Sequence, residues 1–178
     1  MEPPDPPLGD GVVSLRPADE RDLDAIERGI TDSEVIRWFG DPKLSAREAL
    51  GLNRGRWLDG SGPTFAICGA DDRCLGHVWI NVDSDATGAV GYWLLPEARG
   101  RGFATRSVRL VCDWGFRDVG LRELRLLTEP ENLASQRVAE RAGFRRHGQP
   151  PSKADRGGSR RERVVYSLTA DDPRRMTR

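Results

Sequence analysis

The segment GYWLLPEARGRGFAT, residues 91–105, is the most informative part of this chain. It predicts a strand over Ala89–Leu95, which Pro96 ends, then a glycine-bearing turn and a helix that begins near Phe103. The first turn of such a helix presents backbone N–H groups that have no partner one turn back, next to the positive end of the helix dipole. This arrangement suits a pyrophosphate or another anion.

The residues of the turn favour the same interpretation. Gly100 and Gly102 let the backbone approach phosphate oxygens without a Cβ in the way. Arg99 and Arg101 add positive charge, and the Thr105 hydroxyl can donate a hydrogen bond. The spacing alone fits an ordinary strand-to-helix turn equally well. It excludes a P-loop, because G-x-x-x-x-G-K-[ST] is absent, and a Rossmann fingerprint, because Thr105 stands where the third glycine belongs.

Outward from this segment, strands and helices alternate between turn residues. Expected strands cover residues 12–16, 64–68, 74–82, 89–95, 123–128, 144–147 and 163–168, and expected helices cover residues 19–29, 33–39, 45–58, 103–119 and 133–142. Antiparallel strands followed by strand–helix units predict a mixed α/β (α+β) sheet domain. We expect one domain over residues 11–172, with flexible termini at residues 1–10 and 173–178.

Charge and cysteine content narrow the class of protein. The 28 basic and 28 acidic residues cancel, which argues against recruitment to nucleic acid by bulk charge. Residues 1–34 hold ten acidic and three basic residues, a net charge of −7, and residues 145–178 hold ten basic and four acidic residues, a net charge of +6. These ends either attract each other or are solvated faces.

Neither a membrane span nor a metal site is expected. No apolar run approaches the roughly 18 residues of a span, and the two histidines and scattered cysteines lack metal-ligand spacing. Three cysteines without a C-x-x-C pair are typical of a reduced intracellular protein. We therefore expect a cytoplasmic protein that binds no nucleic acid, no membrane and no metal.

Two ordered motifs resemble those of the GNAT N-acetyltransferases. Arg99-x-x-Gly102-x-Ala104 after a strand is similar to the family's acetyl-CoA pyrophosphate loop, and Asn132-Leu133-Ala134-Ser135 is similar to its second cofactor motif. Together with the latter, Gly91-Tyr92-Trp93-Leu94 resembles the branch that acetylates the N-termini of bacterial ribosomal proteins. The resemblance spans residues 12–168. It implies the GNAT fold, a mixed, mostly antiparallel sheet of about six or seven strands with about four helices.

This resemblance implies acetyl-CoA as the acyl donor and assigns roles to the matching positions. The backbone of residues 92–94 would pair with the pantetheine arm and stabilise the oxyanion of acyl transfer. Amides of residues 100–105 would hold the pyrophosphate. Asn132 would bond the pantetheine and Ser135 would stabilise or protonate the leaving thiolate, although these residues also suit an N-cap and a first helical turn. The implied cofactor-binding residues are Tyr92, Trp93, Leu94, Arg99, Gly100, Arg101, Gly102, Phe103, Ala104, Thr105, Asn132 and Ser135.

Direct transfer also needs a group that accepts the proton of the amine. Positions where relatives carry an acid, a glutamate base and a tyrosine acid hold Ala89, Leu127 and Ala139. His77, Glu129 and Asp83 remain as candidates, with Ser135 as the further catalytic residue. A water relay is the alternative base, and His77 also fits a structural role in a central strand.

Helices before the sheet carry acceptor specificity in this family, so Trp38, Phe39 and Trp57 are candidates for the acceptor wall or for core packing. The expected function is direct transfer of acetyl from acetyl-CoA to a primary amine, a protein N-terminus or a small molecule, through a ternary complex. The alternatives are a CoA-binding regulatory or structural module without turnover and a transferase that uses another acyl-CoA. The sequence leaves open the acceptor, the base, the acyl preference and the choice between monomer and homodimer.

Overall fold

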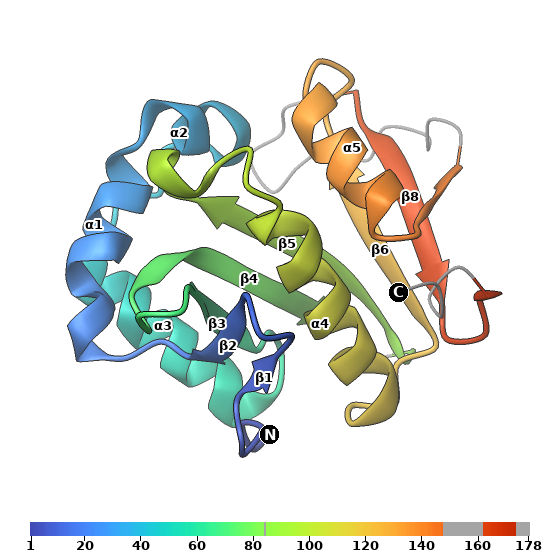
Figure 1. The fold of residues 1–178 in the computed structure, drawn as a ribbon, viewed down its shortest axis with the longest axis horizontal. Helices are drawn as coiled ribbons and strands as arrows, with labels where there is room; N and C mark the ends of the chain where they lie inside the picture. The colour runs from blue at the N-terminus through green and yellow to red at the C-terminus, as the bar shows by residue number, and fades with distance from the viewer. Residues whose placement is uncertain (84, 148–161, 174–178) are drawn as a thin grey trace.

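A computed structural model describes residues 1–83, 85–147 and 162–173 and shows one sheet in the order β1-β2-β3-β4-β5-β6-β8-β7 (Figure 1). The strands are β1 (Leu8–Gly9), β2 (Ser14–Pro17), β3 (Thr64–Cys68), β4 (Cys74–Val82), β5 (Thr87–Leu94), β6 (Glu123–Thr128), β7 (Arg145–His147) and β8 (Val164–Thr169). Among the described strands, neighbours pair antiparallel except β5 and β6, which pair parallel. The mixed, mostly antiparallel sheet is therefore confirmed.

Helices cover both faces of this sheet. They are α1 (Leu23–Thr31), α2 (Ser33–Phe39), α3 (Ala46–Asp59), α4 (Phe103–Arg117) and α5 (Leu133–Arg141), with 3-10 turns η1 (Glu20–Asp22) and η2 (Pro96–Ala98). Apolar residues of α4 pack with those of α5 in one core cluster, whereas α1 and the first half of α3 pack on the opposite face (Figure 1). The amphipathic stripe of α4 explains this, since Val108 and Val111 are fully buried.

Expected and observed elements differ mainly at the N-terminal end. The expected helix over residues 19–29 is a 3-10 turn followed by α1, because Asp19 caps the turn at Arg21 N and the Asp22 carboxylate accepts from Asp19 N. The sheet begins at Leu8, inside the segment expected to be flexible, because Leu8 pairs with Leu15. This two-residue strand brings the described sheet to eight strands, beyond the expected six or seven.

The acidic N-terminal residues are paired with arginines that lie near them in space. Bidentate bonds of 2.7 and 2.9 Å join the Arg16 guanidinium to the buried Asp22 carboxylate. Arg106 on α4 reaches Asp10 at 2.7 Å, and Arg47 reaches Glu20 at 3.1 Å. These pairs engage three of the ten acidic residues, and none of the three arginines belongs to the basic C-terminal block.

Strands β5 and β6 separate halfway along their length. Their parallel register runs from Thr87 opposite Glu123 to Val90 opposite Leu126. Beyond that point β5 continues through residues 91–94 while β6 ends at Thr128, and no further β5–β6 pairing follows. The sheet therefore opens at this point. None of the helices in the described ranges is long and apolar enough to cross a membrane.

Candidate active site

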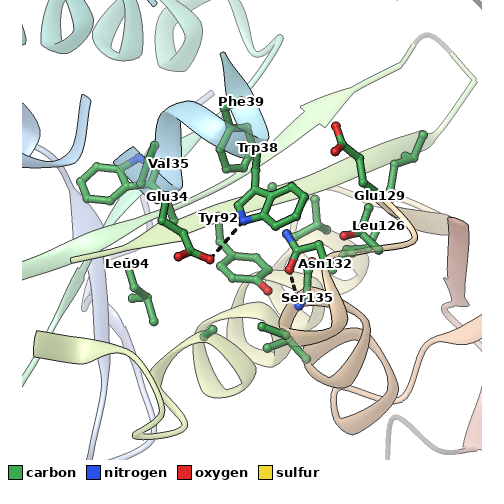
Figure 2. A pocket seen from close by; sticks show the side chains of 18 of the residues that line it. Glu34, Val35, Trp38, Phe39, Tyr92, Leu94, Leu126, Glu129, Asn132 and Ser135 are labelled. Carbon is green, nitrogen blue, oxygen red and sulfur yellow. Dashed lines mark hydrogen bonds between the residues drawn. The ribbon is translucent and has the colours of Figure 1, made fainter. Parts of the chain in front are cut away.

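A cleft of about 450 Å³ occupies the opening between β5 and β6. Residues of both strands, of α2 and of the first turns of α4 and α5 line it (Figure 2). Tyr92 lies on the sheet face that α4 covers, and Trp79 lies on the opposite face, next to Phe39 of α2. Both line the cleft, which therefore reaches both sides of the sheet.

The backbone of β5 faces the opening at alternate residues. Leu95 N donates to Leu75 O at 2.8 Å, so its peptide groups point toward β4. By the alternation of a strand, Trp93 also points its backbone toward β4, whereas Tyr92 and Leu94 point theirs toward the opening. Leu94 O accepts a 3.0 Å bond from Arg99 Nε. Of the three expected residues, Trp93 therefore contributes no backbone group to the opening.

The loop before α4 has the geometry expected of an anion site. Gly100 and Gly102 have φ of +73° and +83°, which other residues adopt only with strain. The bond from Arg106 N to Gly102 O, at 3.1 Å, is the first of the helix. The amides of Phe103, Ala104 and Thr105 therefore have no helical carbonyl to donate to. A Cβ added at either glycine would meet no atom within 4 Å, so both glycines border open space.

The two arginines of this loop are arranged differently from the expectation that both add charge at a phosphate. Arg99 Nη2 donates to Asp32 Oδ1 at 2.6 Å, so its charge is directed at the N-cap of α2. Desolvation raises the pKa of the Asp32 carboxyl. The hydrogen bonds from Arg99 and from the Val35 amide together lower this pKa by more, so the net shift is downward. The Arg101 guanidinium lies over the Phe103 ring, 5.1 Å from its centroid.

The second motif forms the first turn of α5. Asn132 Oδ1 accepts from Ser135 N at 3.0 Å, so Asn132 is the N-cap, and both residues line the cleft (Figure 2). Burial raises the pKa of the Tyr92 hydroxyl to about 12, against a smaller lowering by its hydrogen bond with the Ser135 side chain. Two hydroxyls that stay protonated at neutral pH therefore meet at this wall of the cleft.

The three candidate bases lie in different places. Glu129 lines the cleft. Asp83 lies at the β4–β5 turn, where its carboxylate accepts from Thr87, and it is not among the residues that line the cleft. His77 is buried on β4 against the Trp93 ring, with centroids 4.9 Å apart, and burial lowers its pKa to about 4. The structure thus brings Glu129 to the cleft but not His77 or Asp83.

The acceptor-side candidates also divide. Trp38 and Phe39 line the cleft, whereas Trp57 is a core residue whose Nε1 donates to Thr64 O at 2.8 Å. Sequence reasoning missed Glu34 and Trp79, which also line the cleft. Trp38 Nε1 donates to Glu34 Oε1 at 3.2 Å (Figure 2). The spacing of four residues on one helix could have pointed to Glu34.

Comparisons with known proteins agree with this geometry. The family model described as "Acetyltransferase (GNAT) domain" matches residues 13–145. Bacillus subtilis "Uncharacterized N-acetyltransferase YnaD" is 24% identical over 139 residues, which cover 75% of this chain and 79% of that protein. Mycobacterium smegmatis RimJ in complex with CoA-disulfide superposes with a TM-score of 0.82 at 24% identity, over 97% of this chain and 92% of that one. Spermidine N-acetyltransferase from Vibrio cholerae, in complex with CoA and spermine, gives 0.79 at 19% identity, over 94% and 100%.

The family match covers well over half of the chain, and the fold is that of the matching structures. The protein therefore belongs to the GNAT family of acetyltransferases. It is an acyl-CoA-dependent N-acyltransferase, which confirms the resemblance of the two cofactor motifs.

Proposed function

We propose that this protein transfers acetyl from acetyl-CoA directly to a primary amine in a ternary complex. One observation carries the proposal: the opening between β5 and β6 joins the two faces of the sheet. Acetyl-CoA, with its pyrophosphate at the loop before α4, would extend its thioester into this opening from one side. An amine would reach the thioester from the other side. Neither reactant has to leave before the second one binds.

The groups along the opening fit the donor. The loop of α4 offers the amides of residues 103–105 to a pyrophosphate, and the outward peptide groups of Tyr92 and Leu94 suit the amides of a pantetheine. Thr128 Oγ1 is buried in the cleft wall and has no hydrogen-bond partner within the described part of the chain. A buried hydroxyl without a partner is costly, and a polar group of the donor would satisfy it.

Acetyl-CoA supplies a thioester whose carbonyl carbon is open to a neutral amine. The new C–N bond forms as the C–S bond breaks, the nitrogen loses a proton, and the thiolate gains one. The Tyr92 peptide N–H would stabilise negative charge on the carbonyl oxygen. The hydroxyl of Ser135, which lies beside that of Tyr92, would give the thiolate its proton.

For the proton of the amine, we propose Glu129 or Glu34, acting through water. Both carboxylates line the cleft, and they come from opposite walls, on the loop before α5 and on α2. They would take the place of the acidic residues that relatives carry at the positions of Ala89 and Leu127. The burial of His77 in the core argues against this role for it.

The test combines calorimetry with a CoA-release assay on a panel of primary amines. Acetyl-CoA is expected to bind and to be turned over only when an amine is present. Binding without release for any amine would favour a CoA-binding module. Faster release from succinyl-CoA than from acetyl-CoA would favour another acyl donor, and absence of binding would overturn the proposal.

A further inference from the structure

We infer that the acceptor is a monoamine carried on a flat apolar group, such as an arylalkylamine, and that Trp79 selects it. This inference rests on the proposed function, since it concerns the acceptor end of the same cleft. It is carried by an aromatic corner, made of Trp79 and Phe39, that stands where the two strands separate.

Trp79 lies flat on the backbone of β5. It pairs across the sheet with Gly91, and a Cβ added to Gly91 would meet carbons of the indole at 2.4 Å. Only glycine therefore allows the ring to lie over this position. Gly91 is the first residue of β5 beyond the last pair with β6, Val90 opposite Leu126. The indole is thus fixed beside the point at which the thioester would be attacked.

Phe39 completes the corner from α2. Its ring centroid lies 5.5 Å from that of Trp79, with the planes inclined by 57°. Phe39 is nevertheless 54% exposed, so much of its ring is free to contact another group. A second aromatic ring can pack against such a corner in the geometries that aromatic pairs prefer. Ala89, a small residue on the same strand face as Gly91, also lines the cleft.

The charges of the cleft favour one positive charge rather than several. Among the described residues that line it, Glu34 and Glu129 are acidic and Arg99 and Arg163 are basic. A polyamine places two or more further positive charges along its chain, and among the described lining residues the two arginines offset both carboxylates. One ammonium group is matched by Glu34, which stands next to the Trp38 indole.

Among the described residues on this side of the cleft, few side chains could pair with a peptide backbone. Asn81 is the amide side chain on the same strand face as Trp79, and its Oδ1 already accepts from Arg56. A peptide bound here would bury amide groups against rings, and each amide left without a hydrogen-bond partner would weaken binding. An apolar carbon body has no such groups. The aromatic amine is therefore the better match.

The experiment measures kcat/KM at saturating acetyl-CoA for 2-phenylethylamine, spermidine and a short peptide with an N-terminal serine. We expect 2-phenylethylamine to exceed the other two by about tenfold or more, equivalent to about 1.4 kcal/mol. Trp79→Ala is expected to lower the value for 2-phenylethylamine by about tenfold. Trp79→Phe should keep most of it, because it retains a ring.

Calorimetry of acetyl-CoA with each variant separates this inference from the proposed function. Unchanged acetyl-CoA affinity in Trp79→Ala, with loss confined to the aromatic amine, supports the inference. Preference for spermidine or the peptide overturns it and leaves acetyl transfer intact, as does an equal loss for all three amines. If acetyl-CoA binds but no amine is acetylated, the proposed acetyl transfer and the inferred acceptor are both overturned. If acetyl-CoA does not bind, the proposed function is already overturned at the donor.

Discussion

Arg99 Nη2 lies 2.6 Å from Asp32 Oδ1, so the loop that would hold the donor is tied to the helix that walls the acceptor side. The same carboxylate oxygen caps α2, accepting from Glu34 N at 3.1 Å and Val35 N at 3.0 Å. Arg99 Nε holds Leu94 O at the end of β5. One guanidinium therefore connects β5, the α4 loop and α2.

Arg99→Ala should impair both halves of the cleft. It removes a partly buried ion pair, with the Asp32 side chain 12% exposed, and we expect the KM for the amine to rise about fivefold, equivalent to about 1 kcal/mol. Steady-state kinetics with each substrate varied in turn will measure it. Arg101→Ala is the matched control, because that guanidinium rests on Phe103. An unchanged amine KM in Arg99→Ala would show that α2 is held without the ion pair.

Gly102→Glu should abolish acetyl-CoA binding. The new carboxylate would extend from the loop before α4 into open space and repel the pyrophosphate. Glutamate would also be strained at a φ of +83°. Gly120→Glu shares the strain and the charge, since Gly120 has a φ of +78° and no atom within 4 Å of an added Cβ. It lies beyond the far end of α4, so calorimetry should show normal binding. Equal loss in both variants would point to the fold instead of the loop.

Ser135→Ala should slow turnover more than it weakens donor binding. The backbone N–H of Ser135 still donates to Asn132, so α5 keeps its cap, while the hydroxyl beside Tyr92 is lost. We expect kcat to fall about a hundredfold, the lower end of the range for loss of a general acid. Tyr92→Phe tests whether the phenol shares this task. A normal kcat in Ser135→Ala would return Ser135 to an ordinary first-turn residue.

The sequence predicted the side of the cleft where we propose that the donor binds better than the side proposed for the acceptor. The donor loop depends on local chemistry: Gly100 and Gly102 must take positive φ, and Asn132 caps the helix that follows it. Such features are encoded within a few residues. Strands β3, β4 and β6 have the expected bounds for the same reason, since apolar alternation and turn residues frame them.

The missed features depend on contacts between distant segments. Arg99 pairs with Asp32, 67 positions away, and this turns a charge expected at a phosphate toward a helix cap. Trp79 reaches the cleft because Gly91, on the next strand, makes room for it. Neither contact can be read from the sequence, because the first needs the placement of α2 against the loop before α4 and the second needs the register of β4 and β5. His77 illustrates the converse, because its central strand buries a residue that could otherwise have served as a base.

His77 should make the folded state sensitive to mild acid while contributing nothing to turnover. Burial lowers its pKa from 6.5 to about 4, so between these values the unfolded chain binds a proton that the folded chain does not. Stability is therefore full above pH 6.5 and declines as the pH falls toward 4. From pH 7 to pH 5 this one residue should cost about 2 kcal/mol of unfolding free energy.

His77→Phe is the variant that isolates this effect. A phenyl ring keeps the packing against Trp93 and removes both the titration and the buried Nε2, which has no hydrogen-bond partner within the described residues. Urea denaturation of both proteins at pH 7 and pH 5 should show the smaller loss in the variant, with kcat within about twofold of the parent. A parallel loss in the two proteins would mean that His77 takes up its proton in the folded state. A collapse of kcat with normal stability would restore His77 as the base, because a residue that only fills the core has no reason to alter the chemical step.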